Sequence, residues 1–200
     1  MMKTVLSGWN ALNSALLSAI DARPIAILDH LASLGSAVSC YPAFAVYSAM
    51  LLAAAVASGR RPFSLSPAQA LDSASRWIGI LANFFISFPI GVALASLLES
   101  LGAFPGPVVA HEGAAMLGPG AADWGPRGGH VLLATILAAS LWPILGHGRR
   151  IIAAAFVSWV CVSQVRVGAS FPGEVALYCL MGLVIVRLVR NCLWRLREFS

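Results

Sequence analysis

The chain has 200 residues, of which 59% are hydrophobic and 10% are charged, and its formal net charge is +5. Soluble domains carry about 25% charged residues, so this composition excludes an ordinary soluble globule, a disordered chain and a coiled coil. It indicates a protein that lies mostly in a lipid bilayer. Nucleic-acid binding is not expected, because the basic residues cluster where membrane topology requires them.

The N-terminal region, residues 1–35, is predicted to form helices that lie in the membrane interface. Within residues 4–20 an apolar stripe recurs at helical spacing: Val5, Trp9, Leu12, Leu16 and Ile20. Polar residues occupy the rest of this helix, which is typical of an amphipathic helix that is too polar to span a bilayer. A second short helix is expected to start at Pro24. The polar residues that follow Lys3 argue against a cleavable signal peptide.

Five apolar segments follow, and each is long enough to cross the hydrocarbon core as a helix. They cover residues 37–58, 77–98, 129–146, 151–168 and 174–191. Kinks are expected at Pro89 and near Pro143, because proline removes a hydrogen bond of the helix. The sequence therefore predicts an all-α, polytopic membrane helix bundle that forms one domain over residues 1–200.

The basic residues predict the orientation of this bundle. They lie beside the first connection, beside the third-to-fourth turn and after the last span: Arg60, Arg61, Arg76, Arg149, Arg150, Arg187, Arg190, Arg195 and Arg197. Cytoplasmic segments carry an excess of Lys and Arg, so this side, with the tail 192–200, is expected to face the cytoplasm. The opposite side, with the Gly- and Pro-rich loop 102–128 and the turn 169–173, is expected to face the periplasm or the exterior. The length of the loop favours a lid or a binding surface.

Three further groups of side chains are not expected to carry chemistry. The cysteines form no Cys-x-x-Cys pair and are predicted to be small buried hydrophobes: Cys40, Cys161, Cys179 and Cys192. Aromatic residues of the second span are expected to pack, with a groove for a prenyl tail as the alternative: Phe84, Phe85 and Phe88. His111, Glu112 and Asp123 in the outer loop match no standard metal spacing, so neither a metal nor a cofactor is expected.

Two segments on the expected outer side carry a recognisable order of residues. The first, 121–130, runs into the third span, and the second, 163–175, forms the turn between the fourth and fifth spans. Together they resemble the second and third signature motifs of the type 2 phosphatidic acid phosphatase (PAP2) superfamily, which shares its helical core with vanadium haloperoxidases. The likeness is greatest to small bacterial members that dephosphorylate undecaprenyl diphosphate, and it covers residues 5–190.

The resemblance implies roles for residues at the start of the third span. His130 matches the acid histidine of the second motif, and Gly128 stands where the family has a serine. With Gly129, these positions offer backbone N–H groups at a helix start, which favour anions. Arg127 is the best candidate for a phosphate-binding arginine, with a solvated loop charge as the alternative. The first motif would end beside Gly106, where the family has an arginine.

The third motif aligns without a gap. Ser163 matches the serine of the family, Gln164 stands at the phosphate-binding arginine, Ser170 at the nucleophilic histidine and Glu174 at the aspartate. Arg166 is a second candidate for phosphate binding. Two residues turn a helix by about 200°, so Arg166 is expected to point away from the site unless the helix unwinds there.

The family mechanism, as the resemblance implies it, needs a histidine that attacks phosphorus, a carboxylate that orients it and a second histidine that acts as an acid. Of these groups only His130 and the Glu174 carboxylate remain. The Ser170 hydroxyl is a poor nucleophile, because a carboxylate is a weak base for a hydroxyl. Each remaining group also has a structural alternative: His130 as a polar cap of the third span, and Glu174 as a partner of the helix N-terminus.

We therefore expect a PAP2-like integral membrane protein that is catalytically degenerate. Its outward-facing pocket would bind a membrane lipid with a polyprenyl or glycerolipid phosphate, or a partner subunit, in the bacterial inner membrane. One alternative is an active lipid phosphatase for undecaprenyl diphosphate or phosphatidic acid that uses His130 and Glu174. Another is an accessory subunit of an envelope-biogenesis or lipid-transport complex.

Overall fold

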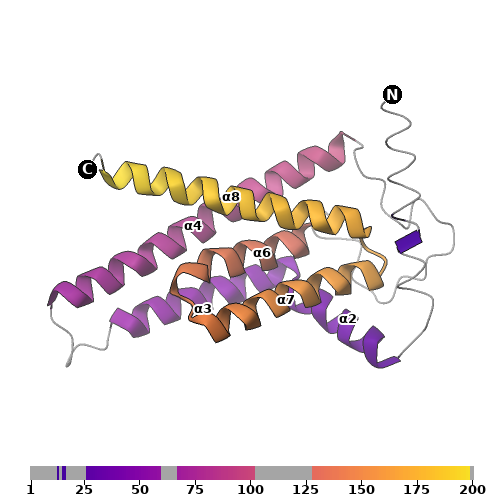
Figure 1. Ribbon diagram of the computed structural model, residues 1–200, viewed down its shortest axis with the longest axis horizontal. Coiled ribbons are helices and arrows are strands. Elements are labelled where there is room, and N and C mark those ends of the chain that lie inside the picture. The colour runs from indigo at the N-terminus through magenta and orange to yellow at the C-terminus, as the bar shows by residue number, and fades with distance from the viewer. Residues whose placement is uncertain (1–12, 14, 17–25, 60–66, 102–127, 199–200) are drawn as a thin grey trace.

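The computed structural model describes residues 13, 15–16, 26–59, 67–101 and 128–198. Within these ranges the chain is almost wholly helical and contains no strand (Figure 1), which confirms the predicted all-α class. The elements are α2 Ala26–Val38, α3 Tyr41–Gly59, α4 Pro67–Ser100, α6 Gly129–Leu141, the 3-10 helix η1 Trp142–Ile144, α7 His147–Arg166 and α8 Pro172–Glu198.

A sharp bend separates α2 from α3, so the predicted span 37–58 is wrong at its start. The helical stretches on either side of the break meet at an angle of 66°. The Ser39 hydroxyl donates to the carbonyl oxygen of Gly35 at 2.7 Å, and this local bond competes with continuation of the helix. Pro42 lies in the first turn of α3, where a helix tolerates proline because the first N–H groups have no partner within the helix.

Within the described part of the chain, α4 and α8 are long and apolar enough to cross a membrane. Their apolar stretches are Ala74–Ser100 and Pro172–Arg195, with mean hydropathies of 2.0 and 1.7. The bent pair α2 and α3 would add a third crossing if it forms one broken span. The other predicted spans coincide with helices, and the count of five spans stays a prediction. The α4 helix continues through Pro89 without a break.

The central helix is α6, which packs against α4, α7 and α8 (Figure 1). It is apolar on every side, and most of its side chains are buried, as expected of a helix surrounded by others. The helix gives way to η1 beside Pro143, where the sequence predicts a kink. The predicted aromatic packing is also confirmed, since the Phe44 ring stacks on Phe84 and Phe88 with centroids 5.3 and 4.3 Å apart.

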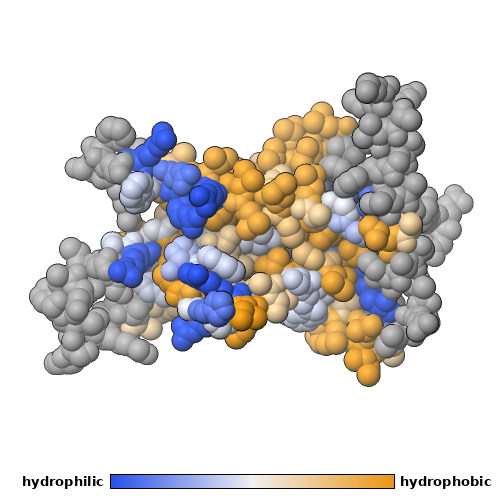
Figure 2. Space-filling view, viewed as in Figure 1, coloured by the Kyte–Doolittle hydropathy of each residue, from blue (hydrophilic) through white to orange (hydrophobic). Residues whose placement is uncertain are grey.

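The outer surface of the bundle is apolar around the middle of its long axis. Figure 2 shows hydrophobic residues in a broad central band, with most of the strongly hydrophilic residues toward the ends of the long axis. Large aliphatic side chains on this surface are more than half exposed, among them Ile78, Leu97, Ile151 and Leu183. An exposed apolar surface of this extent is stable against lipid rather than water. Together with α4 and α8 it indicates a membrane protein.

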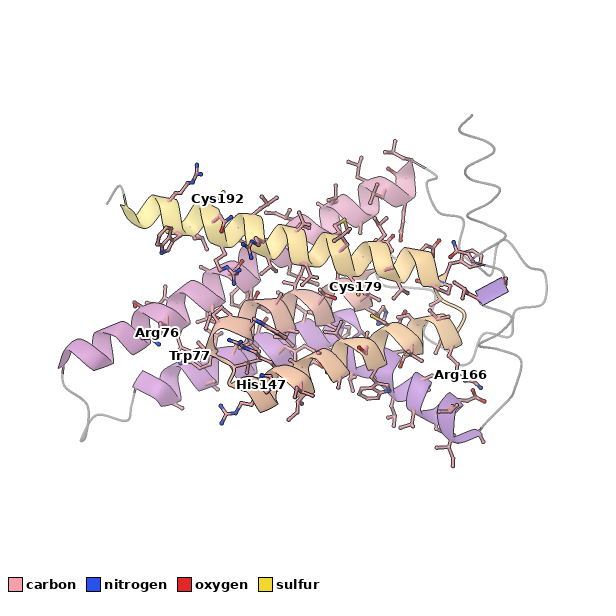
Figure 3. All side chains as sticks on the ribbon, in the orientation of Figure 1. Arg76, Trp77, His147, Arg166, Cys179 and Cys192 are labelled. Atoms are coloured by element: carbon pink, nitrogen blue, oxygen red, sulfur yellow. The ribbon has the colours of Figure 1, made fainter. Side chains whose placement is uncertain are left out.

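The two ends of the bundle differ in chemistry. The first, here called the motif end, holds the start of α6, the end of α7 and the start of α8, with Arg166 (Figure 3). The second, here called the basic end, holds η1, the start of α7 and the last turns of α8, with Arg76, His147 and Cys192 (Figure 3). The predicted interfacial helix 4–20, apart from three of its residues, and the loop 102–127 lie outside the described residues.

Candidate functional site

The third motif folds into a tight connection between α7 and α8. The N–H of Ala169 donates to the Gln164 carbonyl oxygen at 3.0 Å, and the N–H of Gly168 donates to that of Val165 at 3.1 Å. These two bonds form a Schellman motif, which ends a helix and needs a left-handed residue next to its last turn. Gly168 supplies that residue with a φ of 75°, a conformation that costs glycine little. The N–H of Ser170 also reaches the Gln164 carbonyl, at 3.3 Å.

The Glu174 carboxylate caps the start of α8. Its Oε2 accepts a hydrogen bond from the backbone N–H of Phe171 at 2.9 Å, and the side chain is only 3% exposed. A glutamate in the third helical position that reaches back to the N-cap N–H is one half of a capping box. Asn13 adds a second cap, because its Oδ1 accepts from the N–H of Gly173 at 3.0 Å. Asn13 is therefore buried, although the sequence places it on the polar face of an interfacial helix.

The α2 helix lies directly against α7 at the motif end. Gly35 permits this approach, because a Cβ at this position would collide with the Ser163 hydroxyl. The Ser163 side chain turns back on its own helix and donates to the Trp159 carbonyl oxygen at 2.7 Å. The Trp159 indole N–H donates to the Leu31 carbonyl oxygen at 3.0 Å, which ties the two helices one turn farther along.

Arg166 forms an ion pair with α2. Its Nε donates to Asp29 Oδ1 at 2.8 Å, and the two side chains are 7% and 22% exposed. Gln164 contacts the same helix at Ser36, about two helical turns from Asp29. Arg166 and Gln164 thus both contact α2, although the sequence predicts that a rotation of about 200° points Arg166 away from the site.

His130 and Gln164 meet on the last turn of α2. Two oxygens lie near His130 Nδ1, the Ser36 carbonyl at 3.1 Å and the Ser39 hydroxyl at 3.2 Å. The Gln164 amide donates to the Ser36 hydroxyl at 3.2 Å. The structure thus brings the positions matched to the acid histidine and to a phosphate-binding arginine onto one serine. The sequence analysis missed Ser36 and Ser39, which carry no signal in a run of small residues.

These contacts define the proton positions on His130. A carbonyl oxygen only accepts, so the contact with Ser36 places a proton on Nδ1. The Ser39 hydroxyl gives its own proton to Gly35, and it is then also an acceptor toward His130. In the neutral ring Nε2 is therefore the unprotonated nitrogen, which accepts hydrogen bonds and takes up a proton.

Ser170 is the unusual member of the site. Its side chain is 0% exposed, and its hydroxyl has no hydrogen-bond partner among the described residues. An unpaired buried hydroxyl costs about 1–3 kcal/mol, so it calls for a reason. Among the described residues no hydrogen-bonding group reaches this oxygen, so no base contacts it there.

Gly128 has no room for the serine found at this position in the PAP2 motif. A Cβ on Gly128 would collide with the ring of Tyr178, which is buried beside it. Gly129 is buried as the first residue of α6, next to His130. Five residues considered in the sequence lie outside the described residues: Gly106, His111, Glu112, Asp123 and Arg127.

Searches against protein-family models, curated proteins and solved structures find no match for this chain. Within the described residues no group of three or more His, Cys, Asp or Glu side chains is arranged to hold a metal ion. The functional interpretation therefore depends on the contacts at the two ends of the bundle.

Proposed function

We propose that the chain is a catalytically degenerate PAP2-like membrane protein whose motif end binds a lipid phosphate without hydrolysing it. The ligand class is a polyprenyl or glycerolipid phosphate. The proposed location is a bacterial inner membrane, with the motif end facing the periplasm. This orientation is supported by the arginines gathered at the opposite end, since cytoplasmic segments are rich in Arg and Lys.

The buried, unpaired hydroxyl of Ser170 is the observation that carries this proposal. A hydroxyl that attacks phosphorus needs a base within hydrogen-bond reach, and none of the described residues supplies one to Ser170. A hydroxyl that binds a phosphate oxygen needs only a proton to donate and an acceptor to receive it. Ser170 thus has the chemistry of a binding group and lacks the chemistry of a nucleophile.

The neighbouring groups support anion binding. The backbone of Ser170 bonds to Gln164, and the Gln164 side chain carries amide donors toward α2. The first N–H groups of α6, beside Gly129 and His130, form a helix N-terminus that favours negative charge. The Glu174 carboxylate, which would repel a phosphate, is bound to the N–H of Phe171.

The test measures phosphate release and lipid binding on the same purified protein. Undecaprenyl diphosphate and phosphatidic acid are each added to the protein in nanodiscs, and inorganic phosphate and bound lipid are quantified. We expect binding without release. Ser170→Ala is expected to weaken binding about tenfold or more, because a hydrogen bond to a charged acceptor contributes about 1.5–3 kcal/mol.

Ser158→Ala is the matched control, since Ser158 is an exposed serine of α7 and its loss should leave binding unchanged. Equal binding by the wild type and Ser170→Ala would contradict the proposal. Phosphate release that disappears in His130→Ala would replace it with the alternative of an active phosphatase. That alternative retains support from His130, whose Nε2 is free of a proton in the neutral ring.

A further inference from the structure

A cavity of about 670 Å³ lies at the basic end, far from the motif residues. Its walls come from α4, from the end of α6 with η1, and from the last turns of α8: Ser75, Arg76, Ile78, Asn83, Ser140, Ile144, Arg190 and Trp194 are among the lining residues. Cavities of this volume are typical of small-molecule sites. Figure 3 shows Arg76 at this end, opposite Arg166.

The charged side chains among the described lining residues are both arginines. Arg76 enters from α4 and Arg190 from α8, two helices that pack against each other. Among the residues that the structure describes, no acidic side chain lines the cavity. Guanidinium groups bind phosphate oxygens with paired hydrogen bonds, so two arginines in the lining of one cavity favour an anionic group there.

A buried hydroxyl belongs to the lining of the cavity. Ser140 is 1% exposed, lines the cavity and has no hydrogen-bond partner for its Oγ within the described structure. Beside it, Asn83 accepts a hydrogen bond from the Ser87 hydroxyl at 3.0 Å, so this wall is polar deep inside the bundle. An unpaired hydroxyl at such a depth is explained by a ligand that accepts its hydrogen bond.

The rest of the lining is apolar. Ile78, Ile144 and Trp194 contribute to the walls, and Ile78 and Trp194 are also largely exposed, at 62% and 66%. The cavity thus joins a cationic and polar interior to the apolar surface that faces lipid. A ligand that suits both parts has an anionic head and a hydrocarbon tail.

We propose that this cavity binds an anionic phospholipid through its phosphate, held by Arg76 and Arg190, with its chains along the apolar rim. The site is separate from the motif end and does not depend on the function proposed there. The same phosphate chemistry would also suit free inorganic phosphate. The apolar rim favours the lipid, and the experiment separates the two sources.

The test is photo-crosslinking of the full chain in nanodiscs with a photoreactive phosphatidic acid, followed by mapping of the labelled peptides. We expect labelled peptides from the lining segments 75–83 and 190–194. Excess unlabelled phosphatidic acid should remove the label, whereas phosphatidylcholine and inorganic phosphate at the same concentration should not. Labelling confined to 163–175 would support the motif end and overturn the cavity proposal.

Two variants test the arginines against a matched control. Arg76→Gln and Arg190→Gln are each expected to reduce labelling of the cavity about tenfold, since a hydrogen bond to a charged group is lost. Arg195→Gln makes the same change on an exposed residue of α8 outside the lining and should leave labelling unchanged. An equal loss in all three variants would show general charge attraction and contradict a site.

Ser140→Ala keeps the charges and removes only the hydroxyl. It is expected to reduce cavity labelling severalfold while the melting temperature of the lipid-free protein stays the same or rises, because an unpaired buried group is removed. Unchanged labelling in Ser140→Ala, or competition by inorganic phosphate as strong as by phosphatidic acid, would overturn the proposal.

Discussion

Tyr178 occupies the space that a side chain at position 128 would need. A Cβ on Gly128 would meet the ring of Tyr178, and Tyr178 is fully buried. Gly128→Ser is therefore expected to destabilise the protein by about 1–3 kcal/mol, the usual cost of overpacking a core. Thermal unfolding of the purified protein in detergent measures the change.

Gly148→Ser is the control for this substitution, because a Cβ at Gly148 meets nothing within 4 Å. A smaller residue at position 178 should also recover part of the loss, so Gly128→Ser combined with Tyr178→Leu should be less destabilised than the sum of the single changes. If Gly128→Ser and Gly148→Ser have the same melting temperature, the packing of the Tyr178 ring against Gly128 is wrong.

The polar cluster at the motif end was only partly predictable from single residues. His130 and Gln164 were singled out by their places in two motifs, and the structure brings both to α2. Their shared partner Ser36 lies 94 and 128 residues away in sequence, and nothing in one sequence reports such a pairing. The position of Glu174 predicts two roles, and its hydrogen bond with the N–H of Phe171 fits the role of a helix cap.

Two free cysteines lie close together where helix α7 packs against helix α8. The Sγ atoms of Cys161 and Cys179 lie 3.3 Å apart, and both cysteines are free. A disulfide needs about 2.05 Å between sulfurs, a shift that small side-chain rotations supply. We expect copper phenanthroline, a mild oxidant, to join Cys161 to Cys179 in native membranes.

The measurement counts free thiols after oxidation, denaturation and maleimide labelling. The wild type should lose two of its four reactive cysteines, whereas Cys161→Ser should keep all three of its own. Retention of four labels in the oxidised wild type would contradict the packing of α7 on α8.

The ends of helices were predicted well where an apolar run stops at turn-forming residues. They were predicted poorly where contacts with other parts of the fold determine where a helix ends. The connection between α7 and α8, residues 167–171, overlaps the predicted turn 169–173. The bend between α2 and α3 was missed because residues 37–58 are mostly apolar, and hydropathy does not respond to the local bond of Ser39. The start of α4 at Pro67 was missed because its first turns are too polar for a span.

Across the whole molecule, positive charge is distributed unevenly between the two ends of the bundle. The described arginines gather at the basic end, apart from Arg166, which is paired with Asp29 at the motif end. Length and composition alone predicted the membrane class, because 10% charged residues cannot cover a soluble surface. Length and composition did not predict the cavity at the basic end. Its walls come partly from α4 and α8, which are far apart in sequence and pack against each other in the fold.

The distribution of charge also makes the orientation testable with native residues. Cys192 is exposed near the end of α8, at the basic end, and positive residues favour the cytoplasmic side (Figure 3). A membrane-impermeant maleimide should therefore label Cys192 in inside-out vesicles and leave it unlabelled in intact bacterial cells. Cys192→Ser removes the signal and identifies the residue. In that background Ser100→Cys, at the opposite end of α4, should be labelled in intact cells, and the reverse pattern for both residues would invert the proposed topology.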